Sequence, residues 1–266
     1  FYGCSSLRSL DLSHFDTSNA TTFSSMFYNC ESLASLDVSM FDTAAATDLS
    51  QVFYGCKSLT ELDLSRASTA KAETFYGMFS GCSGLKRIDL SLLDTSSARN
   101  LSYLFADCSK LESVNFTGIK TSIVTDFNHM FSGCSSLASL DLSSFDTSAA
   151  KNMSHLFYGC SSLRTLDLSS FDTSSAETMV NLFYGCSSLA EVTLGESFAW
   201  VGGNCFLLQP SAGDIPGADG LWHAASDGAS YQPSAVPGNK ADTYRAVAPG
   251  GEGVAADAAD GASGVD

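Results

Sequence analysis

Cysteine recurs at a constant interval along most of this chain. Eight of its nine cysteines are spaced 26 residues apart, at Cys4, Cys30, Cys56, Cys82, Cys108, Cys134, Cys160 and Cys186. A phenylalanine stands three residues before each of these cysteines, and a leucine stands three residues after it. Self-similarity at one fixed period indicates stacked copies of a single structural unit. The chain is therefore expected to fold as a solenoid, because such a unit buries its apolar side only against the next copy.

The repeat unit reads roughly MFYGCSSLxxLDLSxFDTSxAxxMSx. Within one unit, Leu137, Leu140 and Leu142 follow the L-x-x-L-x-L pattern of a leucine-rich repeat. Successive side chains of a strand point to opposite faces, so these leucines should point inward while Ser139 and Asp141 face solvent. The first half of each unit therefore predicts one short strand, and stacked units predict a parallel sheet.

The second half of the unit predicts a short helix. The apolar residues after the FDTS turn have the i, i+3, i+6, i+7 spacing of one helical face: Ala150, Met153, Leu156 and Phe157. Thr147 or Ser148 is the expected N-cap. The predicted fold class is α/β: a leucine-rich-repeat solenoid with a parallel β-sheet on its concave face and short helices on its convex face.

Composition changes near residue 195, where the repeats end. All five prolines and both tryptophans lie beyond this point. We predict a solenoid over 1–195, a small β-rich capping module over 196–248, and a flexible acidic linker over 249–266. Because the chain begins at Phe1 in the middle of a repeat, we expect the solenoid to be truncated at its N-terminus and to be a piece of a longer protein.

The repeats resemble a known family. Residues 1–195 are similar to the BspA-like leucine-rich-repeat surface proteins of bacteria, in the branch with MFxxCxxLxxLDLSxFDTS units. The segment beginning LGESFAWVGG resembles the module that follows the repeats in that family. The resemblance implies an extracellular protein on a bacterial cell surface, wall-attached through sequence outside this chain, with a role in adhesion. Coil five departs from the unit, with NFTGIK over 115–120, and is expected to be irregular.

Charge and motifs exclude several functions. The formal net charge of −16 argues against nucleic acid and anionic membranes, since both bind clustered Lys and Arg. No apolar stretch approaches the length of a membrane span, so we expect no direct membrane insertion of this fragment. The sequence has no GxSxG, HExxH or glycine-rich phosphate loop. We therefore expect no enzyme, no catalytic residue and no cofactor.

Three sets of repeated residues invite a metal hypothesis, and each has a simpler interpretation. The cysteine column lacks C-x-x-C pairs and its parallel side chains do not converge, which favours buried free thiols. Two aspartate columns, one beginning at Asp11 and one at Asp16, repel by about 0.9 kcal/mol per stacked pair in water. Hydrogen bonds to nearby hydroxyls and amides are the favoured relief, and calcium is the alternative. His129 and His155 share a column, where exposure on a helix is favoured over a metal site.

Binding specificity should reside where the repeats differ, because the invariant columns are explained by packing. The most variable columns lie along the predicted concave face, the usual recognition face of a solenoid. The predicted macromolecule-binding patch consists of Met40, Glu61, Arg66, Arg87 and Leu92. We expect a surface adhesion module whose partner is an extracellular protein or glycoconjugate of a host or neighbouring cell. Two alternatives remain open: a passive stalk that presents another domain, and surface positions without any specific role.

Overall fold

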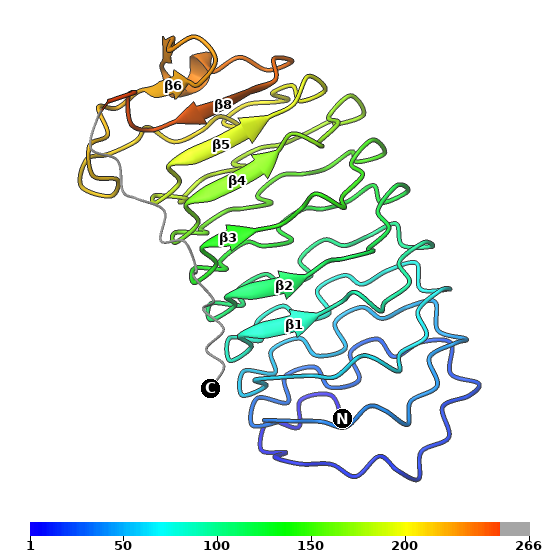
Figure 1. Ribbon diagram of the computed structural model, residues 1–266. Coiled ribbons are helices and arrows are strands. Elements are labelled where there is room, and N and C mark those ends of the chain that lie inside the picture. The colour runs from blue at the N-terminus through cyan, green and yellow to red at the C-terminus, as the bar shows by residue number, and fades with distance from the viewer. Residues whose placement is uncertain (251–266) are drawn as a thin grey trace, which may run out of the picture.

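The computed structural model describes residues 1–250, which form a stack of coils followed by a cap (Figure 1). The repeats place parallel strands along one side of the stack, here called the strand face, where they form a two-stranded sheet followed by the parallel part of a six-stranded sheet. The strands of this face are β1 (Arg87–Asp89), β2 (Ser113–Asn115), β3 (Ser139–Leu140), β4 (Thr165–Leu168) and β5 (Glu191–Leu194). Leu166 lies opposite both Leu140 and Val192, so neighbouring strands are one 26-residue repeat apart.

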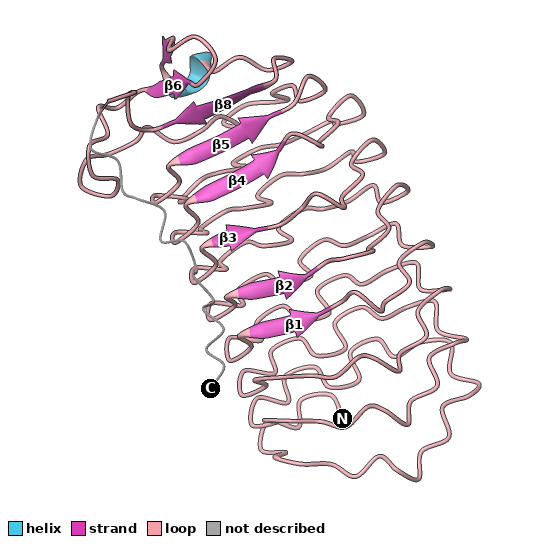
Figure 2. Ribbon diagram, viewed as in Figure 1, coloured by secondary structure: helices cyan, strands magenta, loops and turns pink. Residues whose placement is uncertain are grey.

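The coils before β1 are loops with the same stacking (Figure 2). Their backbone amides still bond to the neighbouring coil, as in the 3.1 Å hydrogen bond from Ser32 to the carbonyl of Ser5. Ser58 makes the equivalent 3.0 Å bond to Glu31 one coil further on. The absence of regular strand pairing in these described coils therefore does not interrupt the stack.

The core between the two sides of each coil contains ladders of identical side chains. The phenylalanines before the cysteines stack nearly parallel, with ring centroids of consecutive pairs 5.5 to 6.0 Å apart from Phe1 to Phe183. Leucines such as Leu137 and Leu163 are fully buried beside them. Each coil therefore covers the apolar surface that its neighbour would expose to solvent if it stood alone.

The predicted helices on the convex face are wrong. The described residues contain a single helical element, the short 3-10 helix η1 (Pro233–Ala235), which lies outside the repeats. Opposite the strand face, on what is here called the turn side, each coil is a series of tight turns. The amides of Met153, His155 and Phe157 donate to carbonyls of the next coil at 2.8 to 3.1 Å. Residues between them, such as Leu156, donate within their own coil to the carbonyl three positions earlier.

Left-handed residues explain why no helix forms on the turn side. His155 has φ of 59° and Gly159 has φ of 70°, both far from helical values. These residues direct alternate amides out of the coil and toward the next one. The apolar spacing still has the helical appearance, because tight turns also return Met153 and Phe157 to the same buried side.

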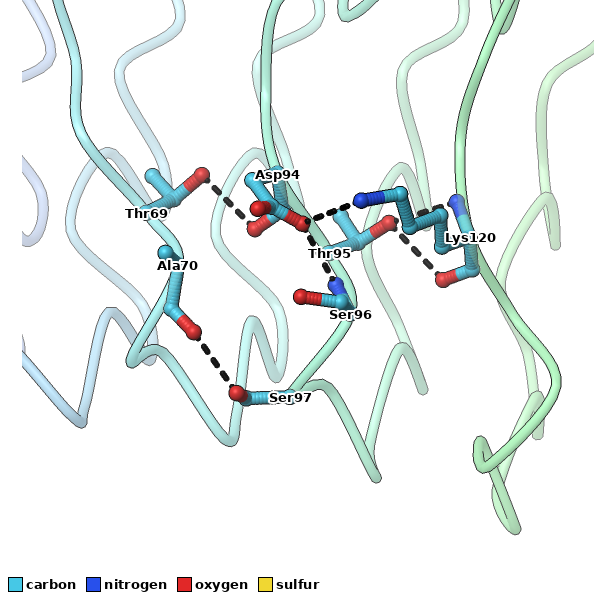
Figure 3. A network of polar contacts seen from close by, with 7 residues as sticks. All are labelled: Thr69, Ala70, Asp94, Thr95, Ser96, Ser97 and Lys120. Carbon is cyan, nitrogen blue, oxygen red and sulfur yellow. Dashed lines mark hydrogen bonds and ion pairs between the residues drawn. The ribbon is translucent and has the colours of Figure 1, made fainter.

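A ladder of buried threonines ties the coils together at the FDTS turn (Figure 3). The hydroxyl of Thr95 donates to the carbonyl of Lys120 at 2.8 Å and accepts the amide of Lys120 at 2.8 Å. The hydroxyl of Thr69 donates in the same way to the carbonyl of Asp94 at 3.0 Å. Thr147, expected to cap a helix, instead bonds to Asp172 of the following coil. The threonine of the FDTS turn therefore links its coil to the next one by hydrogen bonds.

Coil five is regular, contrary to expectation. Asn115 accepts the amide of Thr117 at 3.0 Å, as the aspartates do in the other coils. Phe116 and Ile119 are buried at 3% and 5% exposure. Lys120 replaces an aspartate and forms a 3.3 Å ion pair with Asp94 of the preceding coil (Figure 3). The substitutions keep the local hydrogen bond and the apolar positions, so the register is preserved.

The segment predicted as a capping module, 196–248, contributes three strands at the end of the sheet: β6 (Trp222–Ala224), β7 (Ser230–Tyr231) and β8 (Asp242–Arg245). β8 pairs antiparallel with β5, and β6 then pairs antiparallel with β8. The amide of Ala199 donates to the hydroxyl of Thr173 at 2.7 Å, which continues the threonine ladder into this segment. Of the predicted linker 249–266, residues 251–266 lie outside the described part.

Candidate binding surface

The strand face carries an open groove of about 1040 Å³ across four neighbouring coils. It is lined by the outward side chains of these coils and by the partly exposed edges of the inward ones. Strand alternation creates this lining: in β1, Ile88 is buried while Arg87 and Asp89 are exposed. The groove therefore combines the repeated aspartates with outward positions that differ between coils, such as Ser35, Glu61 and Arg87.

The predicted binding residues fall partly on this groove. Glu61 and Arg87 line it, and Leu92 lines an adjoining hollow of about 90 Å³. Met40 and Arg66 are exposed and line neither cavity. The two apolar members of the patch are prominent on the surface, since Met40 is 59% exposed and Leu92 is 66% exposed.

The groove is acidic. Asp37, Glu61, Asp63 and Asp89 line it, against Arg87 as the one cation of its lining. Arg87 also forms a 3.5 Å ion pair with Glu112, and both side chains are exposed. A groove with four carboxylates and one shared guanidinium is complementary to a positively charged segment.

Each aspartate of the strand-face column is held by a local hydrogen bond. The carboxylate accepts the backbone amide of the serine two residues later at 2.8 to 2.9 Å, in the pairs Asp11–Ser13, Asp37–Ser39, Asp63–Ser65, Asp89–Ser91, Asp141–Ser143 and Asp167–Ser169. The serine hydroxyl and amide lower the pKa of Asp37, with a smaller contribution from Arg66. The predicted local hydrogen bonds are confirmed, and the lowered pKa values of Asp37, Asp63 and Asp89 keep these groove aspartates ionised at neutral pH.

The cysteine column is a second hydrogen-bond ladder. From Cys30 to Cys186, each thiol donates to the carbonyl of the phenylalanine of the preceding coil at 3.0 to 3.2 Å. All nine cysteines are free, which confirms the predicted thiol ladder. Burial raises the pKa of Cys56 to about 12, and it also raises the pKa of Cys82 well above the usual value of a thiol. These thiols are therefore protonated and poor metal ligands or nucleophiles. Within residues 1–250, no three His, Cys, Asp or Glu residues are grouped to hold a metal ion.

His129 and His155 stack on the turn side, where the sequence predicted exposed helical residues. Their ring centroids lie 4.2 Å apart, and Tyr103 stacks on the other face of His129 at 4.5 Å. Both histidines are half-buried and left-handed, with φ of 56° and 59°. Burial, together with the neighbouring His155, lowers the pKa of His129 to about 4. Exposure on a helix was therefore the wrong expectation for this pair.

A solenoid of 26-residue coils with an open groove on its strand face defines a leucine-rich-repeat-like module for protein interaction or surface display. The chain belongs to the family described as "Mycoplasma protein of unknown function, DUF285", whose model matches residues 1–115 and again 74–195. This membership supports the predicted BspA-like repeat family.

Other comparisons add little. No curated protein matches the sequence. Among solved structures, a leucine-rich repeat protein from Bacteroides ovatus is 18% identical, with 75% of this chain and 68% of that chain covered. The TM-score of this match is 0.26. No helix in residues 1–250 is long and apolar enough to cross a membrane.

Proposed function

We propose that this chain is an adhesion module of the BspA-like branch with MFxxCxxLxxLDLSxFDTS units, displayed on the surface of a bacterial cell. Its strand-face groove binds a basic segment of an extracellular protein or glycoconjugate from a host or neighbouring cell. The chain has no turnover of its own, and its attachment to the wall comes from sequence outside residues 1–266. The observation that carries the proposal is the acidic groove of about 1040 Å³ across four stacked coils of the strand face.

The chemistry of the groove supports this partner class. Its aspartates are ionised and stand on a backbone fixed by inter-coil hydrogen bonds, so little conformational entropy is lost when a partner binds. Leu92, 66% exposed, offers an apolar contact at the edge of the acidic surface. Electrostatic attraction would guide a basic partner to the groove and would weaken as salt is added.

The proposal is tested by adhesion to immobilised host matrix and to epithelial cells. The variant Glu61→Arg reverses one groove charge, and Leu92→Ser removes the exposed apolar contact at the edge of the acidic surface. Both variants should adhere less than the wild type. A matched control, Glu73→Arg/Ile123→Ser, reverses one charge and removes one apolar side chain at exposed positions outside the groove lining. This control should adhere as the wild type does. The free energy of unfolding of every variant should lie within about 0.5 kcal/mol of the wild-type value.

The passive stalk is the second candidate function, because the variable positions are also those that packing leaves unconstrained. Equal adhesion of the wild type, both groove variants and a protein lacking coils one to four would favour the stalk. Loss of adhesion in the control variant alone would place the recognition surface outside the strand-face groove.

A further inference from the structure

A second cavity, of about 530 Å³, lies where the last coil meets the terminal segment, away from the strand-face groove. The last coil contributes Asn181 and Tyr184 to its lining. The terminal segment contributes residues that follow β5 in the chain, among them Asn204 and Gln209, and residues at η1, among them Gln232. Figure 1 shows this end of the stack, where β8 lies against β5. The cavity is thus assembled from two parts of the chain that meet only in the folded protein.

We propose that this junction cavity binds a neutral carbohydrate. The first reason is an aromatic ring available for stacking. Tyr184 is 55% exposed, and one of its faces stacks on Tyr158 at a centroid distance of 5.1 Å and an interplanar angle of 15°. The neighbouring ring holds Tyr184 in place while the rest of its surface remains accessible. Such a ring offers a flat apolar surface for the C–H face of a sugar together with a polar hydroxyl.

The second reason is a set of amide side chains suited to hydroxyl groups. The side chains of Asn204, Gln209 and Gln232 are on exposed residues and make no hydrogen bond to other groups within residues 1–250. Each carboxamide both donates and accepts, which matches the dual character of a sugar hydroxyl. Asn181 is held differently, because its amide nitrogen lies 3.1 Å from Nε2 of His155.

The third reason is the absence of charge. The chain has a formal net charge of −16, yet the cavity lining contains no Lys, Arg, Asp or Glu. An ionic ligand would leave water without finding a counter-charge there, which is unfavourable. The volume also falls within the range of small-ligand sites, roughly 300 to 1,000 Å³. Charge, shape and amide content therefore all select an uncharged polyhydroxyl ligand.

Both tryptophans lie directly behind the lining and give the site an optical readout. Trp200 packs against Phe206, with ring centroids 5.8 Å apart. The indole nitrogen of Trp222 donates to the carbonyl of Leu208 at 2.9 Å. Phe206 and Leu208 both line the cavity. Occupancy of the site should therefore change intrinsic tryptophan fluorescence.

The experiment screens the whole chain against an array of neutral, sialylated and sulfated oligosaccharides. The best neutral oligosaccharide is then titrated while tryptophan fluorescence is recorded. Tyr184→Ala should weaken its binding about tenfold, the loss expected for one aromatic stacking contact with its buried area. Gln209→Ala and Gln232→Ala should also weaken it. Retention of only sialylated or sulfated glycans, or of no glycan, would overturn the proposal.

Tyr2→Ala is the matched control, since it removes the same side chain from the same repeat position at the other end of the stack. Tyr2 is 68% exposed and stacks on Tyr28 at 4.6 Å, so its environment resembles that of Tyr184. This variant should bind within roughly twofold of the wild type. If Tyr184→Ala and Gln232→Ala are folded and bind like the control, the cavity is not the site. The result is independent of the strand-face groove and leaves the adhesion proposal untouched.

Discussion

The hydroxyl of Thr95 makes two hydrogen bonds to one residue of the next coil: it donates to the carbonyl of Lys120 and accepts the amide of Lys120. Both bonds are 2.8 Å long, and Thr95 is 2% exposed. The bonds join the two coils at a buried point where the chain changes direction. Removing the hydroxyl therefore leaves two backbone groups without this partner.

Thr95→Val should lower the free energy of unfolding by about 1 to 3 kcal/mol, because valine has the same shape and leaves buried polar groups unpaired. Urea denaturation followed by circular dichroism measures the change. Thr60→Val is the control, since Thr60 is exposed and its side chain makes no hydrogen bond within the described residues. An equal loss in both variants would contradict a special role for the threonine ladder.

The cysteines should differ in their reaction with an alkylating agent. Cys4 is exposed, whereas the other eight are buried, so brief treatment of the native protein should modify Cys4 alone. After unfolding without a reductant, intact-mass measurement should show nine modified thiols. Fewer than nine would reveal disulfides and would be incompatible with the thiol ladder.

The stacked histidines should make stability depend on pH in the mildly acidic range. Burial lowers the pKa of both His129 and His155 in the folded state, to about 4 for His129. As the pH falls, these histidines therefore take up protons in the unfolded chain before they do so in the folded protein. The free energy of unfolding should be highest above pH about 6.5 and should decrease as the pH falls toward 4. Thermal melting between pH 7.5 and 4.5 measures this decrease.

The double variant His129→Gln/His155→Gln should flatten that dependence. Glutamine suits the left-handed position, because Gln51 occupies the same repeat column with φ of 56°. Aspartates contribute at lower pH, since the pKa of carboxyls such as Asp63 is lowered by hydrogen bonds from Ser65. An unchanged slope in the double variant between pH 6.5 and 4.5 would mean that other groups control the transition.

Two substitutions of Tyr244 in β8 should separate the contribution of its ring to stability from the contribution of its hydroxyl. The side chain is fully buried, and its hydroxyl has no hydrogen-bond partner within residues 1–250. Tyr244→Phe should therefore be neutral or should stabilise by up to about 1 kcal/mol. Tyr244→Ala should cost about 3 to 5 kcal/mol, as for other large core residues. A clear loss in the phenylalanine variant would show that the hydroxyl is bonded in solution.

The strand half of the repeat could be predicted from the sequence for the coils that carry β1 to β5, whereas the earlier coils keep the stacking without regular strands. Leu137, Leu140 and Leu142 alternate with polar residues, and stacking at a 26-residue period then determines the register. The helix prediction was wrong because burial spacing alone does not separate a helix from a series of tight turns. A better signal was present: glycine, asparagine or aspartate precedes every repeat cysteine, and all of these residues have positive φ.

The candidate sites were predictable to different degrees. The variable strand positions identified Glu61 and Arg87, because outward residues are assigned by alternation alone. The junction cavity was missed, since Tyr184 and Gln232 lie 48 residues apart and no repeat pattern relates them. The threonine of the FDTS turn was mistaken for a helix cap, although its recurrence in coil after coil is typical of a structural position.

The bonds that join coils, such as Phe53 to Met78 and Thr95 to Lys120, link residues 25 apart in the chain and run along the stack. A force pulling the two ends of the solenoid apart therefore loads a few bonds at a time rather than all of them together. Under such a force the solenoid should unfold one coil at a time. Each coil released adds roughly 90 Å of extended chain, because its 26 residues span about 3.3 to 3.6 Å each. A load across the stack would thus be absorbed by lengthening before all coils are lost.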